Sequence, residues 1–234
     1  MPRLFFAVCL TFFLVPLALC PAKDKTGQTA KNAGWKPLFD GKTLKNWTVP
    51  AYGGEGKITV KDRIVIIGNG ETMSGIRYEK EFPKINYEIR YEAQRTKGSD
   101  FFAACTFPVK KEFCTFINGG WGGSLTGLSS VDHLDASENI TATSFEYKDG
   151  VWYRFRISVT ETHIRVWITP PNTDSDKKEK PKAEPKEELV IELETKDREL
   201  SVRSEMSSYQ PLGFCTWSSE GQIRNAEYRI LEKK

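Results

Sequence analysis

The residue types best suited to chemistry gather between Phe113 and Asn139. Glycine pairs flank Trp121 in the run Gly119–Gly123, and a polar cluster with one of the two histidines follows. Glycine permits turns that are closed to other residues and lets a ligand approach the main chain closely. A tryptophan between glycines has few neighbours, so its flat ring is either an exposed platform for a ligand or is buried under the loop. The polar cluster consists of Asp132, His133, Asp135, Glu138 and Asn139.

This polar cluster could supply a general base or bind a cation. The ordinary pKa of histidine, ~6.5, suits proton abstraction at neutral pH, so His133 is the predicted base; the alternative is a surface histidine that only bonds a neighbour. Asp132, Asp135 and Glu138 could hold a divalent cation that polarises a carbonyl group. Alternatively, they belong to a solvated acidic loop in which aspartates cap turns.

Three cysteines, Cys105, Cys114 and Cys215, follow the N-terminal segment. An odd number leaves at least one free thiol or an intermolecular pair. Cys105 and Cys114 flank a predicted turn at Val109–Glu112 and could face each other across a hairpin; we favour three buried, small apolar side chains. None of the three cysteines has the spacing of a zinc site, so no zinc ligand is predicted.

Residues 1–22 have the organisation of a secretory signal peptide. A basic start precedes the apolar run Leu4–Leu19, and Ala22 is a small residue at the expected cleavage site. The sequence therefore predicts export to the periplasm or the outside of the cell, with a lipid anchor on Cys20 as the less favoured alternative. The apolar run is too short for a membrane span, and no later segment is apolar enough to form one. Residues 23–33 are small and polar and predict a flexible segment.

The charge balance excludes some classes of partner. The formal net charge is +3, with 34 basic and 31 acidic residues mixed along the chain. This balance gives no indication of binding to nucleic acid or to an anionic membrane surface.

Short alternating segments dominate from Gly34 onward. Residues 85–95 and 152–160 alternate apolar and polar side chains, and residues 58–66 read as a hairpin with its turn at Lys61–Arg63. No segment keeps an apolar period of 3.6 residues. Many short strands separated by turns predict that residues 34–234 form one all-β domain, a two-sheet antiparallel β-sandwich of the jelly-roll type. Residues 170–188 hold four prolines and almost no apolar side chains, and they predict a mobile charged insertion between two strands.

The segment Trp35–Trp47, WKPLFDGKTLKNW, resembles the opening signature of the 3-keto-disaccharide hydrolase domain family. The resemblance extends over residues 34–232 and includes Trp152-Tyr-Arg, Ile164–Trp167 and Pro211–Gly213. It implies a concanavalin A-like jelly roll that is secreted or envelope-bound in bacteria that degrade carbohydrate.

The resemblance also implies a reaction, the cleavage of glycosides whose glucose ring is oxidised at C3. A ketone at C3 acidifies the C2 proton, so a base can remove it, the aglycone leaves by elimination, and water adds back. This needs a general base and a group that stabilises the enolate. Many members of the family have a strand that contains Asn-Ser-Gly-Ile, and this chain has Ser99–Phe102 at that place. Site residues are therefore predicted from the local pattern of this sequence and not carried over from the family. Trp121, Asp100 and Asn139 are predicted to contact the sugar.

Other chemistries lack their motifs. The spacing E-x-D-x-x-E of concanavalin A-like retaining glucanases is absent, which disfavours a two-carboxylate retaining mechanism. There is no Gly-x-Ser-x-Gly elbow and no phosphate-binding loop. Three hypotheses remain: an exported hydrolase or lyase of 3-keto-glycosides, a non-catalytic lectin-like module that binds a glycan, and a structural envelope protein without a ligand.

Overall fold

The computed structural model describes residues 34–171 and 186–232. The predicted signal peptide, the segment 23–33 and residues 172–185 of the charged insertion lie outside the described residues, so these three interpretations stay predictions. Within the described residues, no helix is long and apolar enough to cross a membrane.

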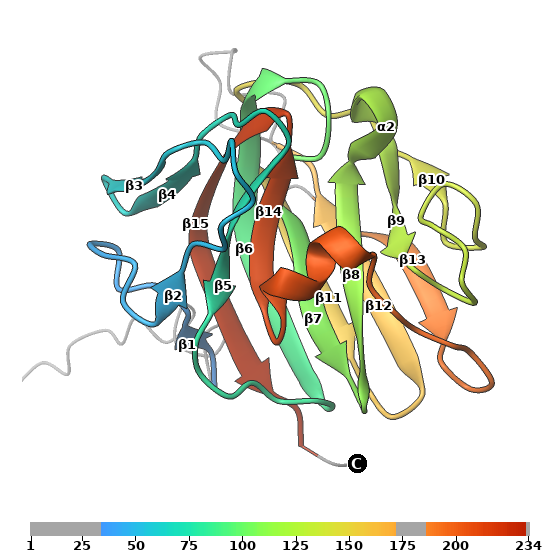
Figure 1. Cartoon of the computed structure of the whole chain (residues 1–234). Helices are drawn as coiled ribbons and strands as arrows, with labels where there is room; N and C mark the ends of the chain where they lie inside the picture. The colour runs from blue at the N-terminus through green and yellow to red at the C-terminus, as the bar shows by residue number, and fades with distance from the viewer. Residues whose placement is uncertain (1–33, 172–185, 233–234) are drawn as a thin grey trace, which may run out of the picture. The chain divides into compact units, whose positions relative to one another are not determined.

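The described chain forms two antiparallel β-sheets packed face to face, which confirms the predicted sandwich (Figure 1). The larger sheet contains, in spatial order, β13 (Glu188–Glu194), β12 (His163–Thr169), β11 (Tyr153–Val159), β6 (Tyr87–Gly98), β15 (Ser219–Ile230), β4 (Ile64–Ile67) and β3 (Ile58–Lys61), with β1 (Lys36–Pro37) paired to β15. The smaller sheet contains β10 (Thr143–Ser144), β9 (Leu125–Ser129), β8 (Glu112–Gly119), β7 (Ala104–Val109), β14 (Gly213–Trp217), β5 (Met73–Tyr78) and β2 (Trp47–Thr48).

The main core fills the space between the two sheets. In β11, Tyr153, Phe155 and Ile157 are buried. Arg154, which lies between Tyr153 and Phe155 in the sequence, is exposed, as the alternation of a strand requires. The ring of Tyr91 from β6 lies 5.1 Å from that of Phe155 and 4.9 Å from that of Phe214 in the opposite sheet. The apolar side chains of the alternating pattern therefore lie on the face of each strand that packs in the core.

The outer face of the larger sheet carries paired charges. Arg156 lies 2.6 Å from carboxylate oxygens of both Glu88 and Glu187, and its guanidinium stacks 3.6 Å from the ring of Trp167. These contacts satisfy the charges within the sheet surface, so this face needs no ligand to explain it.

The outer face of the smaller sheet is covered in part by a second apolar layer. The 3₁₀ helix η3 (Ser204–Tyr209) lies across this sheet (Figure 1), and Met206 and Tyr209 pack against Met73, Ile117 and Cys215. The short glycine-rich turn α2 (Gly120–Gly123) follows the end of β8. Between α2 and η3 part of the sheet face remains open.

All three cysteines of the described residues are free and buried, which confirms the favoured interpretation. In the β7–β8 hairpin Cys105 is paired with Phe116 and Cys114 with Phe107, so the two thiols do not face each other. Burial raises the pKa of each thiol, that of Cys114 to about 12.

Candidate functional site

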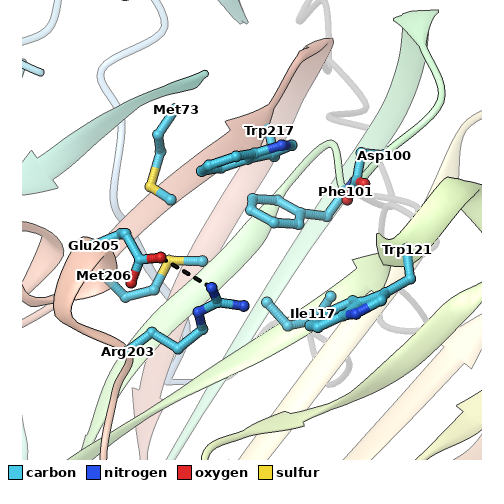
Figure 2. Close-up of a pocket in the computed structure, with 9 residues that line it drawn as sticks. All are labelled: Met73, Asp100, Phe101, Ile117, Trp121, Arg203, Glu205, Met206 and Trp217. Atoms are coloured by element: carbon cyan, nitrogen blue, oxygen red, sulfur yellow. Dashed lines mark hydrogen bonds and ion pairs between the residues drawn. The ribbon is translucent and has the colours of Figure 1, made fainter. Parts of the chain in front are cut away.

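A pocket of about 190 Å³ opens on the outer face of the smaller sheet, between α2 and η3. Its walls come from five separate segments of the chain, and Figure 2 shows their side chains around the pocket. The lining residues are Met73, Asp100, Phe101, Ile117, Trp121, Arg203, Glu205, Met206 and Trp217.

Trp121 stands at one edge of this pocket because the glycines around it bend the chain sharply. Gly119 has a φ of 77°, and Trp121 itself has a φ of 48° and a ψ of 50°, in the left-handed region. Gly120 must lack a side chain, since a Cβ there would lie 2.8 Å from Cγ2 of Ile117. The indole is 46% exposed. The sequence left two positions open for this ring, exposed or buried under the loop, and in the structure the ring is exposed.

The floor of the pocket is apolar. Phe101, Met73, Met206 and Ile117 are buried and present their side chains at its base. The ring of Trp217, which is half-buried, lies 6.5 Å from that of Phe101 at 45°. Apolar walls with a few placed polar groups are typical of small-molecule sites.

Asp100 supplies a carboxylate beside Trp121. It follows β6, and its main chain is fixed by Ser219, whose Oγ accepts from the Asp100 N–H at 3.0 Å. One carboxylate oxygen, Oδ1, accepts from the Phe101 N–H at 2.7 Å. The other oxygen has no partner among the described residues, so it is available to a ligand.

Arg203 and Glu205 form the opposite wall as an ion pair, 2.9 Å apart. Figure 2 shows this pair at the far end of the pocket from Asp100. The pKa of Glu205 is lowered by its own backbone N–H, and by Arg203 and Ser204, against a smaller raising effect of burial. Burial acts to lower the pKa of Arg203, but hydrogen bonds and charge from Glu205 and Asp135 outweigh it and raise that pKa. Both groups are therefore held in their charged forms.

Asp135, one of the predicted catalytic residues, acts on this pocket through Arg203. Its Oδ2 lies 2.6 Å from Nη1 of Arg203, while its Oδ1 accepts from Oγ of Ser129 at 2.5 Å and from the Ala136 N–H at 2.7 Å. These three contacts fix the carboxylate, which in turn fixes the guanidinium. Asp135 is not a lining residue of the pocket.

The structure places His133 and Asp132 away from the pocket. The imidazole of His133 is largely exposed and its Nε2 lies 2.7 Å from Glu199, also exposed. Asp132 accepts from Arg198 at 2.6 Å and from the Glu199 N–H at 3.0 Å. The pKa of Asp132 is lowered by the Glu199 backbone first and then by Arg198. The predicted catalytic roles of both residues stay predictions without support from the pocket geometry.

Asn139 and Glu138 complete the predicted cluster. The Asn139 side chain is buried and donates to the carbonyls of Leu128 at 2.7 Å and Asp135 at 2.8 Å, while its Oδ1 accepts from Thr141. These bonds use its polar capacity to hold the loop. Glu138 is exposed, and its carboxylate has no hydrogen bond or ion pair within the described residues.

No group of three or more His, Cys, Asp or Glu side chains is placed to hold a metal ion in the described residues. The carboxylates proposed for a divalent cation are instead directed to different arginines, Asp132 to Arg198 and Asp135 to Arg203. The five polar residues predicted from the sequence thus do not converge on one point.

The sequence reasoning missed much of the pocket. No local pattern in the sequence predicts a role for Arg203, Glu205, Met206, Met73 or Trp217 in a site. Arg203 meets Asp135 across 68 positions of sequence, so no local motif could have revealed the pair. The helix η3 has the sequence S-E-M-S-S-Y, and six residues are too few to show the apolar period of a helix.

A family model for the 3-keto-alpha-glucoside-1,2-lyase-like domain matches residues 34–227. The chain belongs to this family. The resemblance found from the opening signature is therefore confirmed. No curated protein sequence matches the chain. Family membership supports a carbohydrate-related function.

Similar solved structures agree with the fold. A protein described as a glycosyl hydrolase from Parabacteroides distasonis has 13% sequence identity and a TM-score of 0.52, over 88% of this chain and 97% of that one. The Crh5 transglycosylase in complex with NAG has 10% identity and a TM-score of 0.55, over 86% and 85%. The exoplasmic/lumenal domain of VIP36 in a Ca²⁺-bound form has 8% identity and a TM-score of 0.52, over 81% and 85%. At such low identity these likenesses establish the concanavalin A-like architecture alone.

Proposed function

We propose that this protein is exported and binds a glycoside oxidised at C3 in the pocket between Trp121 and Glu205, where it cleaves the glycosidic bond. The observation that carries this is the composition of the pocket, in which an exposed indole stands beside one free carboxylate oxygen and opposite a fixed Arg–Glu pair. The family to which the chain belongs supports the choice of a 3-keto-glycoside.

Binding would use the two kinds of surface in the pocket. The apolar C–H face of a pyranose stacks on the exposed ring of Trp121, and the buried Phe101 and Met206 exclude water below it. The guanidinium of Arg203 donates hydrogen bonds to sugar hydroxyls, and the carboxylate of Glu205 accepts hydrogen bonds from them.

Asp100 is the base that the pocket geometry favours for cleavage. Its free oxygen takes the C2 proton, and the electrons of the C2–H bond form a C2–C3 double bond while the carbonyl electrons move to the C3 oxygen, which gives an enolate. The enolate then collapses: the C3 carbonyl reforms, the C1–C2 double bond forms, and the C1–O bond breaks. The aglycone leaves as an alcohol after it gains a proton from solvent, and water then adds across the double bond to complete a hydrolysis. Arg203 supplies the positive charge of the pocket, which would stabilise the enolate at C3.

Glycan binding without cleavage is the second candidate, and one observation favours it. Glu205 and Asp135 are both bonded to Arg203, so that guanidinium is already neutralised before a substrate arrives. Its remaining capacity to stabilise an enolate is reduced accordingly.

A chromogenic assay separates the two candidates. Release of nitrophenol from p-nitrophenyl 3-keto-α-glucoside is measured with Ca²⁺, Mg²⁺ or Zn²⁺ added in turn, alongside binding of the methyl 3-keto-glucoside by calorimetry. Cleavage predicts that Asp100→Asn lowers kcat at least ~100-fold with little change in binding. Binding with no release in the unmutated protein would favour the glycan-binding candidate, and no binding at all would refute the pocket assignment.

His133→Ala is the matched comparison for the base. Because His133 lies outside the pocket, the Asp100 assignment predicts unchanged turnover in this variant. A ~100-fold loss in His133→Ala with an active Asp100→Asn would restore His133, the base predicted from the sequence.

A further inference from the structure

The aromatic pocket has two parts of different chemistry. In the view of Figure 2, Trp217 and Met73 lie on one side of Phe101, and Trp121 and Arg203 lie on the other. The part with Trp121 and Arg203 is the place proposed above for the sugar. The remaining part, which we call the apolar half, is formed by Met73, Phe101, Met206 and Trp217.

The backbone brings the side chains of the apolar half together. Trp217 in β14 is directly opposite Met73 in β5 in the register of the smaller sheet. The Trp217 N–H donates to the Phe101 carbonyl at 3.1 Å, and the two rings are 6.5 Å apart. Met206 packs in the same cluster, with its Sδ at 3.5 Å from Sγ of the buried Cys215. The four side chains therefore form one apolar surface.

The apolar half is poorly suited to a second sugar. Among its side chains, the indole N–H of Trp217 is the one strong hydrogen-bonding group, since a thioether sulfur is only a weak acceptor. A sugar aglycone brings several hydroxyls, and each of them that leaves water without a partner costs free energy. An aromatic ring has no such requirement, and it gains from contact with the rings of Phe101 and Trp217 and with the sulfurs of the two methionines.

The volume of the pocket agrees with this division. A cavity of about 150 Å³ is enough for a benzene ring, and this pocket has about 190 Å³. The pocket can therefore enclose one aromatic ring, while the sugar lies toward its mouth, where the indole of Trp121 is exposed.

The carboxylates of the pocket favour the same class of aglycone. Asp100 is the proposed base, and the other lining carboxylate is Glu205. The pKa of Glu205 is lowered by its own backbone N–H first, and by Arg203 and Ser204, so this group stays ionised and has no proton to donate. When the C1–O bond breaks, the electron pair stays on the aglycone oxygen until solvent protonates it. A phenol, with a pKa of ~10 as in tyrosine, bears this charge more easily than a sugar hydroxyl does.

We propose that the substrate is an aryl glycoside oxidised at C3, with its aromatic aglycone in the apolar half. The sugar stacks on Trp121 beside Asp100, and the aglycone ring packs against Phe101, Trp217 and the two methionines. This assignment rests on the function proposed above, whereas the aryl site itself can be tested without cleavage.

Binding to the Asp100→Asn variant compares three aglycones on the same sugar. The ligands are methyl 3-keto-α-glucoside, phenyl 3-keto-α-glucoside and 3-keto-trehalose, whose aglycone is a second glucose, and calorimetry gives their Kd values. The phenyl glucoside should bind at least ~10-fold more tightly than the methyl glucoside, because removal of roughly 55 Å² of apolar surface from water is enough for this factor. 3-Keto-trehalose should bind no more tightly than the methyl glucoside.

Phenol alone probes the apolar half without a sugar. Titrated into the unmutated full chain and followed by NMR, it should bind saturably and shift the indole N–H signal of Trp217. The indole signal of Trp167, which lies on the larger sheet, is the internal control and should not shift.

Variants in the Asp100→Asn background locate the aglycone through the ratio of the methyl to the phenyl Kd. Met206→Gln places an amide in the apolar wall and should lower this ratio at least ~3-fold, whereas Met206→Leu should keep it. Trp217→Ala should also lower the ratio, and because Trp217 is half-buried it keeps the test decisive if Met206→Gln fails to fold. Trp121→Ala should weaken both glucosides by the same factor and leave the ratio unchanged.

Equal Kd values for the methyl and phenyl glucosides would overturn the aryl assignment and leave the function proposed above in place. Tighter binding of 3-keto-trehalose than of the phenyl glucoside, or no shift of Trp217 with phenol, would overturn it as well. A ratio that changes in Trp121→Ala and not in Trp217→Ala would place the aglycone on Trp121 and refute the apolar half as its site. If phenol binds and none of the three 3-keto-glucosides does, the function proposed above fails and the aryl site stands.

Discussion

Replacing Trp121 with alanine should separate ligand binding from stability. The indole is 46% exposed, so about half of its surface contributes to packing. Full burial of a tryptophan makes its truncation cost about 3–5 kcal/mol, so half burial predicts a loss of about 1.5–2.5 kcal/mol in the free energy of unfolding. The left-handed backbone at this position is kept by alanine, so relief of strain adds nothing.

The effect of Trp121→Ala on binding should be larger than its effect on the fold. Tryptophans in contact with a ligand commonly account for about 2 kcal/mol or more, which corresponds to at least a ~10-fold weaker Kd for the methyl 3-keto-glucoside. Calorimetry measures the Kd, and urea unfolding followed by circular dichroism measures the stability.

Trp167→Ala is the matched control for Trp121→Ala. Trp167 is partly buried, more so than Trp121, and it stacks on Arg156 at the outer face of the larger sheet. We expect a comparable loss of stability and an unchanged Kd. An unchanged Kd in Trp121→Ala, or a stability loss above about 3 kcal/mol, would refute the assignment of Trp121 as a binding platform.

Three further predictions concern the pocket walls and the core. Asp135→Asn should release Arg203, lower the stability by about 0.5–1 kcal/mol as for a part-exposed ion pair, and weaken glycoside binding, in urea unfolding and calorimetry respectively. The fold lowers the pKa of Glu205, so the ionised carboxylate stabilises the protein above its ordinary pKa, and this stabilisation is lost as the pH falls through the pKa of the folded state. Glu205→Gln should therefore flatten the acid side of a curve of unfolding free energy against pH. An unaltered curve would contradict this. Because burial raises the pKa of Cys114 to about 12, iodoacetamide at pH 8 should label it only after denaturation, as mass spectrometry would show; labelling of the native protein would contradict its burial.

Much of the fold could be predicted from the sequence because alternation is a local signal. The hairpin of β3 and β4 and the long strand β6 each carry one apolar face, and both appear where the pattern placed them. Strand β5 was missed because its first four residues are all buried, since η3 covers one side of it and the core the other. A strand buried on both faces has no alternation to detect.

The candidate site was harder to predict, for a physical reason. The residues that bound the pocket are joined by contacts such as Arg203 to Asp135 and Phe101 to Trp217, which span long stretches of chain. A single sequence records which polar residues are near each other along the chain, and it does not record which of them share a pocket.

The dense polar cluster after Trp121 shows what such a pattern can mean instead. Asn139 holds the loop through carbonyls, Asp132 is bonded to the exposed Arg198, and Asp135 fixes Arg203 in the aromatic pocket. Two aspartates of the cluster therefore each hold one arginine. A change at Asp135 should therefore alter glycoside binding through Arg203, whereas a change at Asp132, whose partner Arg198 does not line the aromatic pocket, should leave it unchanged. The aspartates of the cluster thus orient arginine side chains, which explains why aspartates are frequent in a loop where a general base was expected.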